Sequence, residues 1–352
     1  MVCASGLLGR AAAEIAALGD FTGLFLLSSP RVARHWQRRL EEALRGSRWK
    51  ATILFDDRES AKAMSTVERI SRKLVRAGAD RKALLVALGG GVVGDVSGFV
   101  AASFLRGVSL VHVPTTLVAQ VDSSIGGKVG VNLLEGKNLV GAFYSPRLVL
   151  ADPDTLATLP DREFRSGIYE VVKYGVIGDT PLFSFLQKNL DQLAARDART
   201  LAYVIPRCVR DKARVVGRDE REAGLREILN FGHTFAHAFE AATQYRRYLH
   251  GEAVGLGMIA ASRLAVRLHL FSSAQSEQVE KLVRGAGPLP PMPQASAARL
   301  VEIMGADKKT RGGRLRFVLP RRIGKVETVS GVPLPAVLAV LNELRAEKEI
   351  GR

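Results

Sequence analysis

The stretch from Leu84 to Asp95 limits the possible folds of this chain more than any other segment. Leu84–Leu88 is a short apolar run typical of a buried strand, and it leads directly into Gly89-Gly90-Gly91-Val92-Val93-Gly94-Asp95. Glycines at the carboxyl end of a strand let the backbone turn sharply and bring its N–H groups close to a pyrophosphate. The positive end of the next helix then lies behind the ligand. We therefore expect a strand–turn–helix unit that binds a dinucleotide.

The glycine spacing matches G-x-G-x-x-G, but the acidic residue that an ordinary Rossmann fingerprint has about 20 positions later is missing. The chain reads Val111-His112-Val113-Pro114 in that region. A plain tight turn between a strand and a helix is the alternative interpretation. Three consecutive glycines after an apolar strand favour phosphate contact over that alternative, although the segment is not expected to be an ordinary Rossmann fingerprint.

Short apolar runs alternate with helical patterns over residues 1–160, which predicts a parallel sheet covered by helices on both faces. The expected strands are Leu24–Ser28, Thr52–Phe55, Ala83–Leu88 and Ser109–Val113, and the expected helices are Gly6–Leu18, Ala61–Ala77 and Asp95–Phe104. Because 352 residues exceed one ordinary core, we expect two domains.

Long helical patterns dominate after residue 160. They cover Phe164–Ile177, Leu182–Ala195, Ala198–Val216, Leu225–Ala242 and Ala253–Leu268. A proline-rich break follows, then an expected hairpin of Leu315–Leu319 with Val326–Val329 and a helix from Pro335. We therefore place an α/β dinucleotide-binding domain at residues 1–160 and a mostly helical metal- and substrate-binding domain at residues 161–352.

The net charge of +16 permits nucleic acid, an anionic membrane or small acidic molecules as partners. The basic residues are scattered through helical patterns and aromatic residues make up only 6% of the chain, so no nucleic-acid module is expected. No apolar run reaches the ~18 residues of a membrane span. Arg10 and Glu14 interrupt the N-terminal apolar stretch, which argues against a signal peptide, and we expect a cytoplasmic protein.

A second polar segment, Pro114–Asn138, is rich in small hydroxyl side chains, glycine, lysine and aspartate. Its polar residues include Thr115, Thr116, Asp122, Lys128, Asn132, Lys137 and Asn138. An exposed loop is the alternative, but Leu117, Val121 and Val131 indicate a packed segment whose polar groups need partners. We expect a loop wrapped around an anion and a polyol.

Residues Leu225–Glu240 are expected to form one apolar, buried helix with a polar stripe. The stripe comprises Arg226, Asn230, His233 and His237, at spacings of four, three and four residues. With His250, three of the six histidines lie within 18 residues, and imidazoles with a carboxylate are the usual ligands of catalytic zinc. Hydrogen-bonded core histidines are the alternative. The spacing leaves open which two histidines bind a metal, and His233 with His237 is the simplest choice.

Glu170 and Lys173 lie at i, i+3 in Ile168–Tyr174 and therefore share one face of a helix. A surface ion pair is the ordinary interpretation of such a spacing. The residues around this pair are apolar, which makes a surface ion pair less favoured here than such a spacing usually indicates.

Taken together, these motifs closely resemble the 3-dehydroquinate synthase family. The resemblance rests on Gly89–Asp95, Pro114–Lys128, Gly136–Asn138, Glu170–Lys173 and Asn230–His237, and it extends in order from about residue 50 to residue 330. It implies an N-terminal α/β NAD domain followed by a mostly helical metal domain. Related sugar-phosphate cyclases and iron-type alcohol or glycerol dehydrogenases share this architecture.

The resemblance also implies roles for individual residues. The metal, zinc or cobalt, would be bound by Glu170, His233 and His250, with His237 beside it but not bound to it. NAD would contact Glu59, Lys62, Gly90, Gly91, Val92, Asp95, Thr115, Thr116 and Lys137. The substrate would meet Arg106, Asp122, Lys128, Asn138, Lys173, Lys212, Arg226, Asn230 and either Lys308 or Lys309. Because Arg106 reaches the neighbouring subunit in the family, a homodimer is expected.

The activity that the resemblance implies is conversion of 3-deoxy-D-arabino-heptulosonate 7-phosphate to 3-dehydroquinate and phosphate, a step of the shikimate pathway to aromatic amino acids. The family's reaction combines transient oxidation by NAD, phosphate elimination, reduction, ring opening and intramolecular aldol closure. Lysines and arginines inside apolar helices suit the carboxylate and phosphate of this substrate. We expect the substrate's own phosphate to remove the C6 proton.

Two departures from the family pattern lie near the N-terminal end of the sequence, and two more are Val129, where threonine is common, and Leu134, where proline is frequent. Only five residues precede Gly6, where a first strand is usual, and Ser29-Pro30-Arg31 replaces an acidic run that contacts the adenosine ribose. Arg31 would suit a 2′-phosphate, although NAD stays the expected cofactor. The alternative functions are another sugar-phosphate cyclase, a metal-dependent polyol dehydrogenase, and a catalytically silent basic scaffold or nucleic-acid binder. Lys128 and Arg226 argue against the dehydrogenase, because a neutral polyol needs no such cations.

Overall fold

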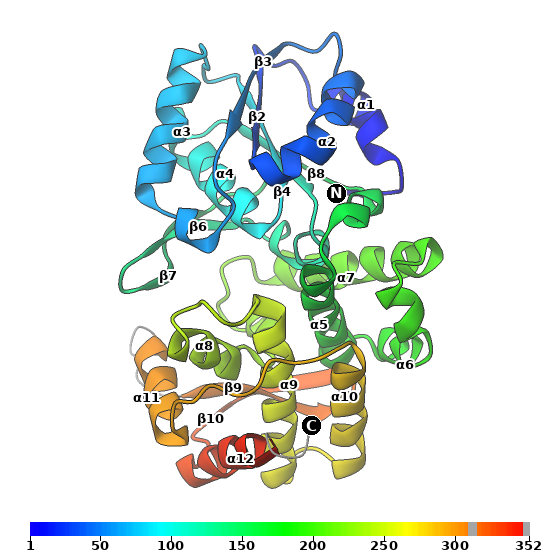
Figure 1. Cartoon of the computed structure of the whole chain (residues 1–352), viewed down its shortest axis with the longest axis vertical. Helices are drawn as coiled ribbons and strands as arrows, with labels where there is room; N and C mark the ends of the chain where they lie inside the picture. Colours follow the sequence, from blue (N-terminus) through cyan, green and yellow to red (C-terminus); the bar gives the residue numbers. More distant parts are fainter. Residues whose placement is uncertain (309–314, 348–352) are drawn as a thin grey trace. The chain divides into compact units, whose positions relative to one another are not determined.

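A six-stranded sheet forms the centre of the first of two structural units (Figure 1). Its strand order is β1-β8-β5-β4-β2-β3, and every neighbouring pair is parallel. The strands are β1 (Val2–Cys3), β2 (Leu24–Ser28), β3 (Trp49–Leu54), β4 (Leu84–Gly89), β5 (Ser109–Pro114) and β8 (Leu148–Ala151). The four expected strands are confirmed, and the two-residue β1 shows that a first strand is present despite the short start.

The computed structural model describes residues 1–308 and 315–347. Unit 1 comprises Met1–Pro160 and Leu201–Ala213, and unit 2 comprises Asp161–Thr200 with the described part of Arg214–Arg352. This division differs from the expected one in the segment Leu201–Ala213, which belongs to helix α7 (Ala198–Arg218). Lys212 on this segment forms an ion pair with Asp122, a contact within unit 1 that the sequence pattern could not reveal.

Helices cover both faces of the sheet, as the alternation of strands and helices predicted. Along β2, Phe25 and Leu27 face one side and pack with α3 (Met64–Arg76) and α4 (Gly91–Ser103). Leu24 and Leu26 face the other side and pack with the short α1 (Ala11–Ala16) and with α2 (Pro30–Ala43). The strict alternation follows from the two-residue period of a strand.

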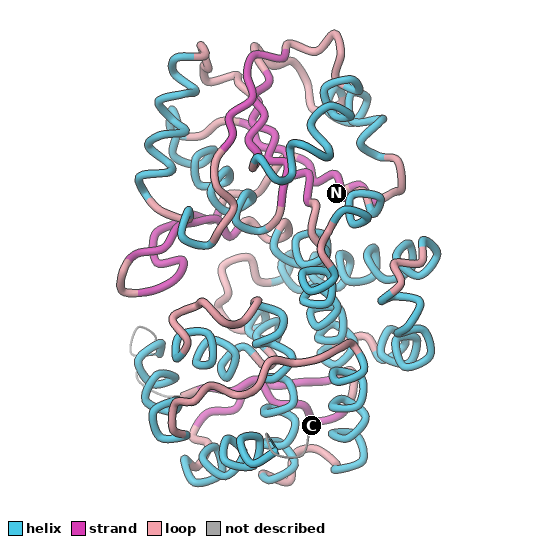
Figure 2. Tube along the Cα trace, in the orientation of Figure 1, coloured by secondary structure: helices cyan, strands magenta, loops and turns pink. Residues whose placement is uncertain are grey.

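The segment expected to be a wrapping loop instead contains a π-helical turn, Ala119–Ser123, and an antiparallel hairpin of β6 (Lys128–Leu133) with β7 (Gly136–Phe143) (Figure 2). A Cβ atom on Gly141 would lie 2.2 Å from the carbonyl oxygen of Val129, and one on Gly98 of α4 would lie 2.3 Å from Val129 Cγ1. Glycine therefore lets the two strands approach each other and the hairpin pack on α4. The loop expectation is corrected, whereas the expected packing of this segment is confirmed.

Unit 2 consists mainly of helices around α9, together with a two-stranded antiparallel sheet. The elements are α5 (Asp161–Ile177), α6 (Thr180–Ala194), α8 (His233–Ala242), α9 (His250–Arg267), α10 (Ser273–Gly285), α11 (Ala297–Lys308), β9 (Arg316–Arg322), β10 (Lys325–Ser330) and α12 (Leu334–Ala346). Nearly every residue of α9 is buried, so this helix forms the core of the unit. The expected hairpin is confirmed.

The expected single helix over Leu225–Ala242 is wrong. The chain forms a 3₁₀ helix over Leu225–Asn230, breaks at Phe231–Gly232 and then begins α8. Gly232 has φ of +80°, a conformation that glycine adopts readily. A Cβ atom there would lie 2.8 Å from the backbone nitrogen of Met258 on α9, so the break also brings the two helices close. Arg226 and Asn230 therefore do not share one helical stripe with the histidines.

Glycines on α9 allow close contact with its two neighbours. A Cβ atom on Gly251 would lie 1.8 Å from the carbonyl oxygen of Ser166 on α5, and one on Gly257 would lie 2.1 Å from the carbonyl oxygen of Gly232. Gly255 faces the ring of Tyr169 at 2.9 Å. Since backbone atoms cannot shift as a side-chain end can, α9 tolerates no larger residue at Gly251 or Gly257 without moving.

This packing predicts opposite effects for two glycine substitutions in helices. Gly257→Ala is expected to destabilise unit 2 by about 2–3 kcal/mol through overpacking. Gly305→Ala in α11, where nothing lies within 4 Å of the added Cβ, is expected to stabilise it by about 0.5–1 kcal/mol. Urea denaturation of both variants measures the two effects, and a neutral Gly257→Ala would contradict the proposed close contact.

The buried His112 on β5 predicts an acid-dependent loss of stability. Burial lowers the pKa of His112 from 6.5 to about 4. The unfolded chain therefore binds this proton first, so its stability contribution is complete above pH 6.5 and is lost as the pH falls toward 4. Over that window the wild-type protein should lose about 3 kcal/mol more than His112→Asn. Denaturation at pH 7, 5.5 and 4 tests this, and parallel losses would refute it.

Candidate functional site

In unit 1 the glycine turn lies at the carboxyl ends of two neighbouring strands. Gly90 precedes the first residue of α4, and the backbone N–H of Thr115, which follows β5, donates to the Gly89 carbonyl at 3.0 Å. A Cβ atom on Gly90 would lie 2.9 Å from Thr116 Cγ2, and one on Gly91 would lie 3.3 Å from Ser123 Oγ. The start of α4, with Val92 in its first turn, thus offers backbone N–H groups to an anion beside two threonines.

A charged cluster lies beside this turn and is centred on Lys62, which is 5% exposed. Its Nζ lies 2.6 Å from Asp95 Oδ2 and 2.5 Å from Asn138 Oδ1. Glu59 Oε1 lies 3.9 Å from both Lys62 Nζ and Lys137 Nζ. Burial raises the pKa of Asp95, and the positive charge of Lys62 opposes that rise. These five residues, all candidates for NAD or substrate binding, therefore form one connected network.

Asn132 also belongs to this cluster, although the resemblance assigned it no individual contact with NAD or the substrate. Its side-chain amide donates to Glu59 Oε1 at 2.9 Å, and its Oδ1 accepts from the backbone N–H of Asn138 at 2.8 Å. Asn138 has φ of +55°, a strained conformation that this hydrogen bond helps to hold. The pairing of β6 with β7 brings the two asparagines together, and no sequence motif specifies that register.

The other substrate candidates of unit 1 occupy different positions. Lys212 is buried and forms an ion pair with Asp122, and its Nζ also donates to the Asp122 carbonyl at 2.7 Å. Lys128 begins β6 and is exposed. Arg106, with φ of +68°, is exposed at the end of the turn that follows α4. Lys212 and Asp122 are therefore held next to each other within unit 1.

Arg31 forms an ion pair with Asp57, a residue to which the sequence patterns assigned no role. Its Nη2 lies 3.3 Å from Asp57 Oδ2, and the Ser29 hydroxyl donates to the same carboxylate at 2.8 Å. Asp57 follows β3, so a carboxylate lies beside the end of β2 even though the usual acidic run is absent. The carboxylate offsets the charge of Arg31 and leaves less attraction for a 2′-phosphate.

In unit 2, three candidate metal ligands come together from three helices. Glu170 lies on α5, whereas His233 and His250 are the first residues of α8 and α9. Glu170 Oε1 lies 3.8 Å from His233 Nε2 and 3.5 Å from His250 Nε2, and one ligand atom from each residue lies within 4.8 Å of the others. This group does not include His237, whose ring centroid is 5.8 Å from that of His233.

The residues of this group fit a divalent metal ion. Glu170 is 1% exposed, and its Oε1 has no hydrogen-bond partner among the described residues. A buried carboxylate oxygen without a donor is costly, and a cation would remove that cost. One carboxylate with two imidazoles is a common set for catalytic zinc, because it leaves coordination positions for a substrate.

The protonation state of His233 also suits metal binding. Burial, followed by the nearby charge of Lys173, holds its pKa well below 6.5, so its ring is neutral near pH 7. His233 Nδ1 lies 3.1 Å from the Phe231 carbonyl oxygen, which accepts a hydrogen bond when Nδ1 carries the proton. That tautomer leaves Nε2, the atom nearer Glu170, free to bind a metal.

Basic and amide side chains near the start of α8 and on α5 are buried or half-buried. Lys173 is 1% exposed, with Nζ 2.6 Å from Glu170 Oε2. Arg226 is 2% exposed and donates to the Glu220 carbonyl at 2.5 Å, and Asn230 donates to Glu222 at 2.9 Å. Of the remaining substrate candidates, Lys309 lies outside the described residues, as does the side chain of Lys308.

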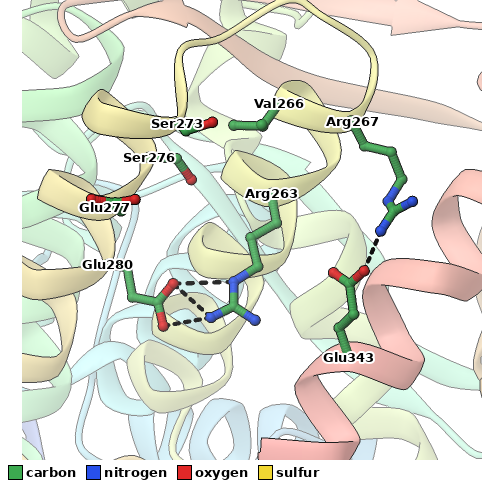
Figure 3. A pocket seen from close by; sticks show the side chains of 8 residues that line it. All are labelled: Arg263, Val266, Arg267, Ser273, Ser276, Glu277, Glu280 and Glu343. Atoms are coloured by element: carbon green, nitrogen blue, oxygen red, sulfur yellow. Dashed lines mark hydrogen bonds and ion pairs between the residues drawn. The ribbon is translucent and has the colours of Figure 1, made fainter.

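A separate cavity of about 400 Å³ lies among α9, α10 and α12, away from these ligands (Figure 3). Arg263 donates to Glu280 at 2.7 Å, and Arg267 pairs with Glu343. Because the arginines of this cavity already bind carboxylates of the chain, we assign no ligand to it.

Comparison with known proteins adds independent findings. The chain matches the family model described as 3-dehydroquinate synthase N-terminal over residues 52–166, and the corresponding C-terminal model over residues 167–310. A curated relative from Koribacter versatilis, named 3-dehydroquinate synthase, is 47% identical over 328 residues, which are 93% of this chain and 89% of that relative.

Two solved structures share the whole fold. The 2-epi-5-epi-valiolone synthase from Streptomyces hygroscopicus, with NAD+ and Zn2+ bound, has a TM-score of 0.90 at 30% identity and covers 99% of this chain and 96% of its own. A 2-deoxy-scyllo-inosose synthase, complexed with carbaglucose-6-phosphate, NAD+ and Co2+, has a TM-score of 0.88 at 28% identity and covers 97% and 96%.

The ligand geometry predicts that Glu170→Ala abolishes stoichiometric zinc binding, because only two imidazoles of the group remain. Glu302→Ala, on the exposed face of α11, should leave the zinc content unchanged. Atomic absorption after dialysis against zinc measures both. Zinc retained by a folded Glu170→Ala protein would remove this residue from the ligand set.

Proposed function

The chain belongs to the 3-dehydroquinate synthase family, and we propose that it converts 3-deoxy-D-arabino-heptulosonate 7-phosphate to 3-dehydroquinate and phosphate. It is a carbon–oxygen lyase of the shikimate pathway. The observation that carries this assignment is the group of Glu170, His233 and His250 in unit 2 of a chain that is 47% identical to a curated member. The lysines and arginines of the candidate site suit an anionic sugar-acid phosphate.

We assign NAD to unit 1 and a zinc or cobalt ion to unit 2. The turn of Gly90, Gly91 and Val92 at the start of α4 would hold the pyrophosphate, with Lys62 and Asp95 beside it. Glu170, His233 and His250 would hold the metal. When bound, NAD+ supplies a reversible hydride acceptor, and the divalent ion supplies a Lewis acid that acidifies hydroxyl groups.

Buried cations are assigned to the anionic groups of the substrate. Arg226 and Lys173 are each at most 2% exposed, so an interaction with a carboxylate or phosphate is weakly screened there. Lys212 is positioned by Asp122, and Lys128, which is exposed at the start of β6, is assigned a contact with one of the anionic groups. Further substrate contacts are assigned to Arg106, Asn138 and Asn230. These side chains would bind and orient the substrate and exclude water from it.

Proton transfer is assigned mainly to the substrate. Its phosphate takes the proton from C6, the C6–C7 double bond forms and the C7–O bond breaks, so phosphate leaves with both electrons of that bond. His237 lies beside the candidate ligands, with its ring centroid 6.4 Å from that of His250, and is assigned a hydrogen-bonding role toward a substrate hydroxyl. The side chains of the site then hold the substrate while the ring opens and closes.

We further propose a cytoplasmic homodimer. The hairpin of β6 and β7 exposes the apolar side chains of Leu133, Leu134, Leu139 and Phe143, which a second copy could cover. Arg106 would reach the site of the other copy. None of the helices in the described part of the chain is long and apolar enough to span a bilayer. Sedimentation analysis should give a dimer that Leu139→Glu weakens, and a monomer would contradict the proposal.

A single assay separates this function from its alternatives. Incubation with the heptulosonate phosphate, NAD+ and zinc should release phosphate without net NADH, because the oxidation is transient. Net NADH from glycerol would support a polyol dehydrogenase. No turnover by the fully metallated protein would contradict the proposed activity. Turnover of a different sugar phosphate alone would support another cyclase, such as the structurally similar valiolone synthase.

A further inference from the structure

Glu240 is a buried carboxylate that lies beside the candidate metal ligand His250, on the side of the ring opposite Glu170. It lies on α8 seven residues after His233, so both side chains share one face of the helix. Glu240 is 2% exposed, and its Oε1 lies 3.5 Å from His250 Nδ1. The other ring nitrogen of His250 lies 3.5 Å from Glu170 Oε1. His250 is therefore between two carboxylates, one on each side of its ring.

The two histidines of the ligand group are held in the same way. His233 has Nδ1 near the Phe231 carbonyl oxygen, and His250 has Nδ1 near Glu240, whereas both Nε2 atoms are turned toward Glu170. An oxygen acceptor at Nδ1 keeps the proton on that atom and leaves the Nε2 lone pair for a metal. A carboxylate is the stronger acceptor, and His250 needs it more because its side chain is 40% exposed and less confined by packing.

Glu240 occupies a position that is unfavourable for a carboxylate. It lies in the last turn of α8, near the negative end of the helix dipole, and it is removed from water. A buried charge in such a place requires compensation by nearby hydrogen-bond donors or positive charge. The His250 ring lies in position to provide part of it, and more so when bound to a cation.

We propose that Glu240 is a positioning residue that fixes the tautomer and orientation of His250 for metal binding. This inference rests on the proposed metal site but not on the proposed reaction. Glu240 itself does not enter the ligand group formed by Glu170, His233 and His250. Its substitution therefore changes how tightly and in what geometry the ion is held, while the three ligands remain.

Metal affinity tests the role directly. Zinc dissociation constants, measured by competition with a chromogenic chelator, should rise about 10–100-fold in Glu240→Ala. Glu240→Gln keeps an oxygen acceptor of the same length and should show a smaller rise. The visible absorption spectrum of the cobalt-loaded protein should change in both variants, because it reports the ligand geometry. Affinity for NAD+, assigned to unit 1, should stay unchanged.

Glu280→Gln is the matched control, since Glu280 is also a partly buried carboxylate of unit 2 but pairs with Arg263 on the cavity of Figure 3. It should leave zinc affinity and the cobalt spectrum as they are in the wild type. Folded Glu240 variants with wild-type zinc affinity and spectrum would overturn the proposal. So would an equal effect of Glu280→Gln.

A measurement on the wild-type protein covers the case in which neither Glu240 variant folds. ¹⁵N NMR of the metal-free protein, assigned with His250→Gln, should show His250 with its proton on Nδ1. A proton on Nε2 would overturn the proposal.

The metal measurements and the activity assay separate this inference from the proposed function. If zinc binding depends on Glu240 but no phosphate is released from the heptulosonate phosphate, the proposed function fails and this inference stands.

Discussion

The contact of Gly251 with the carbonyl of Ser166 determines where His250 lies relative to Glu170. Gly251 follows His250 at the start of α9. Its backbone N–H donates a hydrogen bond to Ser166 Oγ on α5 at 3.0 Å, which also holds the two helices together. Glu252 adds a further restraint, because it accepts from the Leu249 N–H and from Arg162. The backbone of the ligand-bearing turn is thus held on both sides before any metal binds.

Charge is handled differently in the two units. In unit 1, Lys62 is paired with Asp95 within a network that also contains two asparagines. In unit 2, Glu170 has Lys173 at one oxygen and no hydrogen-bond donor at the other among the described residues. In unit 1 the charge of Lys62 is therefore balanced by the carboxylate of Asp95, whereas in unit 2 the Oε1 atom of Glu170 has no hydrogen-bond donor among the described residues. That difference is why the metal assignment follows from the geometry more directly than the nucleotide assignment does.

The sequence predicted most of the strands and helices, because apolar runs and 3.6-residue periods report burial directly. It missed the break at Phe231–Gly232, since an isolated glycine is tolerated in a helix and only the approach of Met258 requires its positive φ. It also left the histidine pair open, because the position of His250 depends on how α9 packs. Glu240 could have been found, since it lies two helical turns after His233.

The glycines of α9 make its sequence a poor helix former when the segment is separated from the rest of unit 2. Gly251, Gly255 and Gly257 lie close together in one helix. Each makes the free energy of helix formation less favourable by about 1 kcal/mol relative to alanine. The segment is therefore a poor helix until α5 and α8 provide surfaces that only glycine can approach. Helix formation, docking and presentation of His250 then occur as one cooperative event. A chain with unit 2 incorrectly folded would lose its ion entirely, not partially, which makes metal content a direct indicator of correct folding.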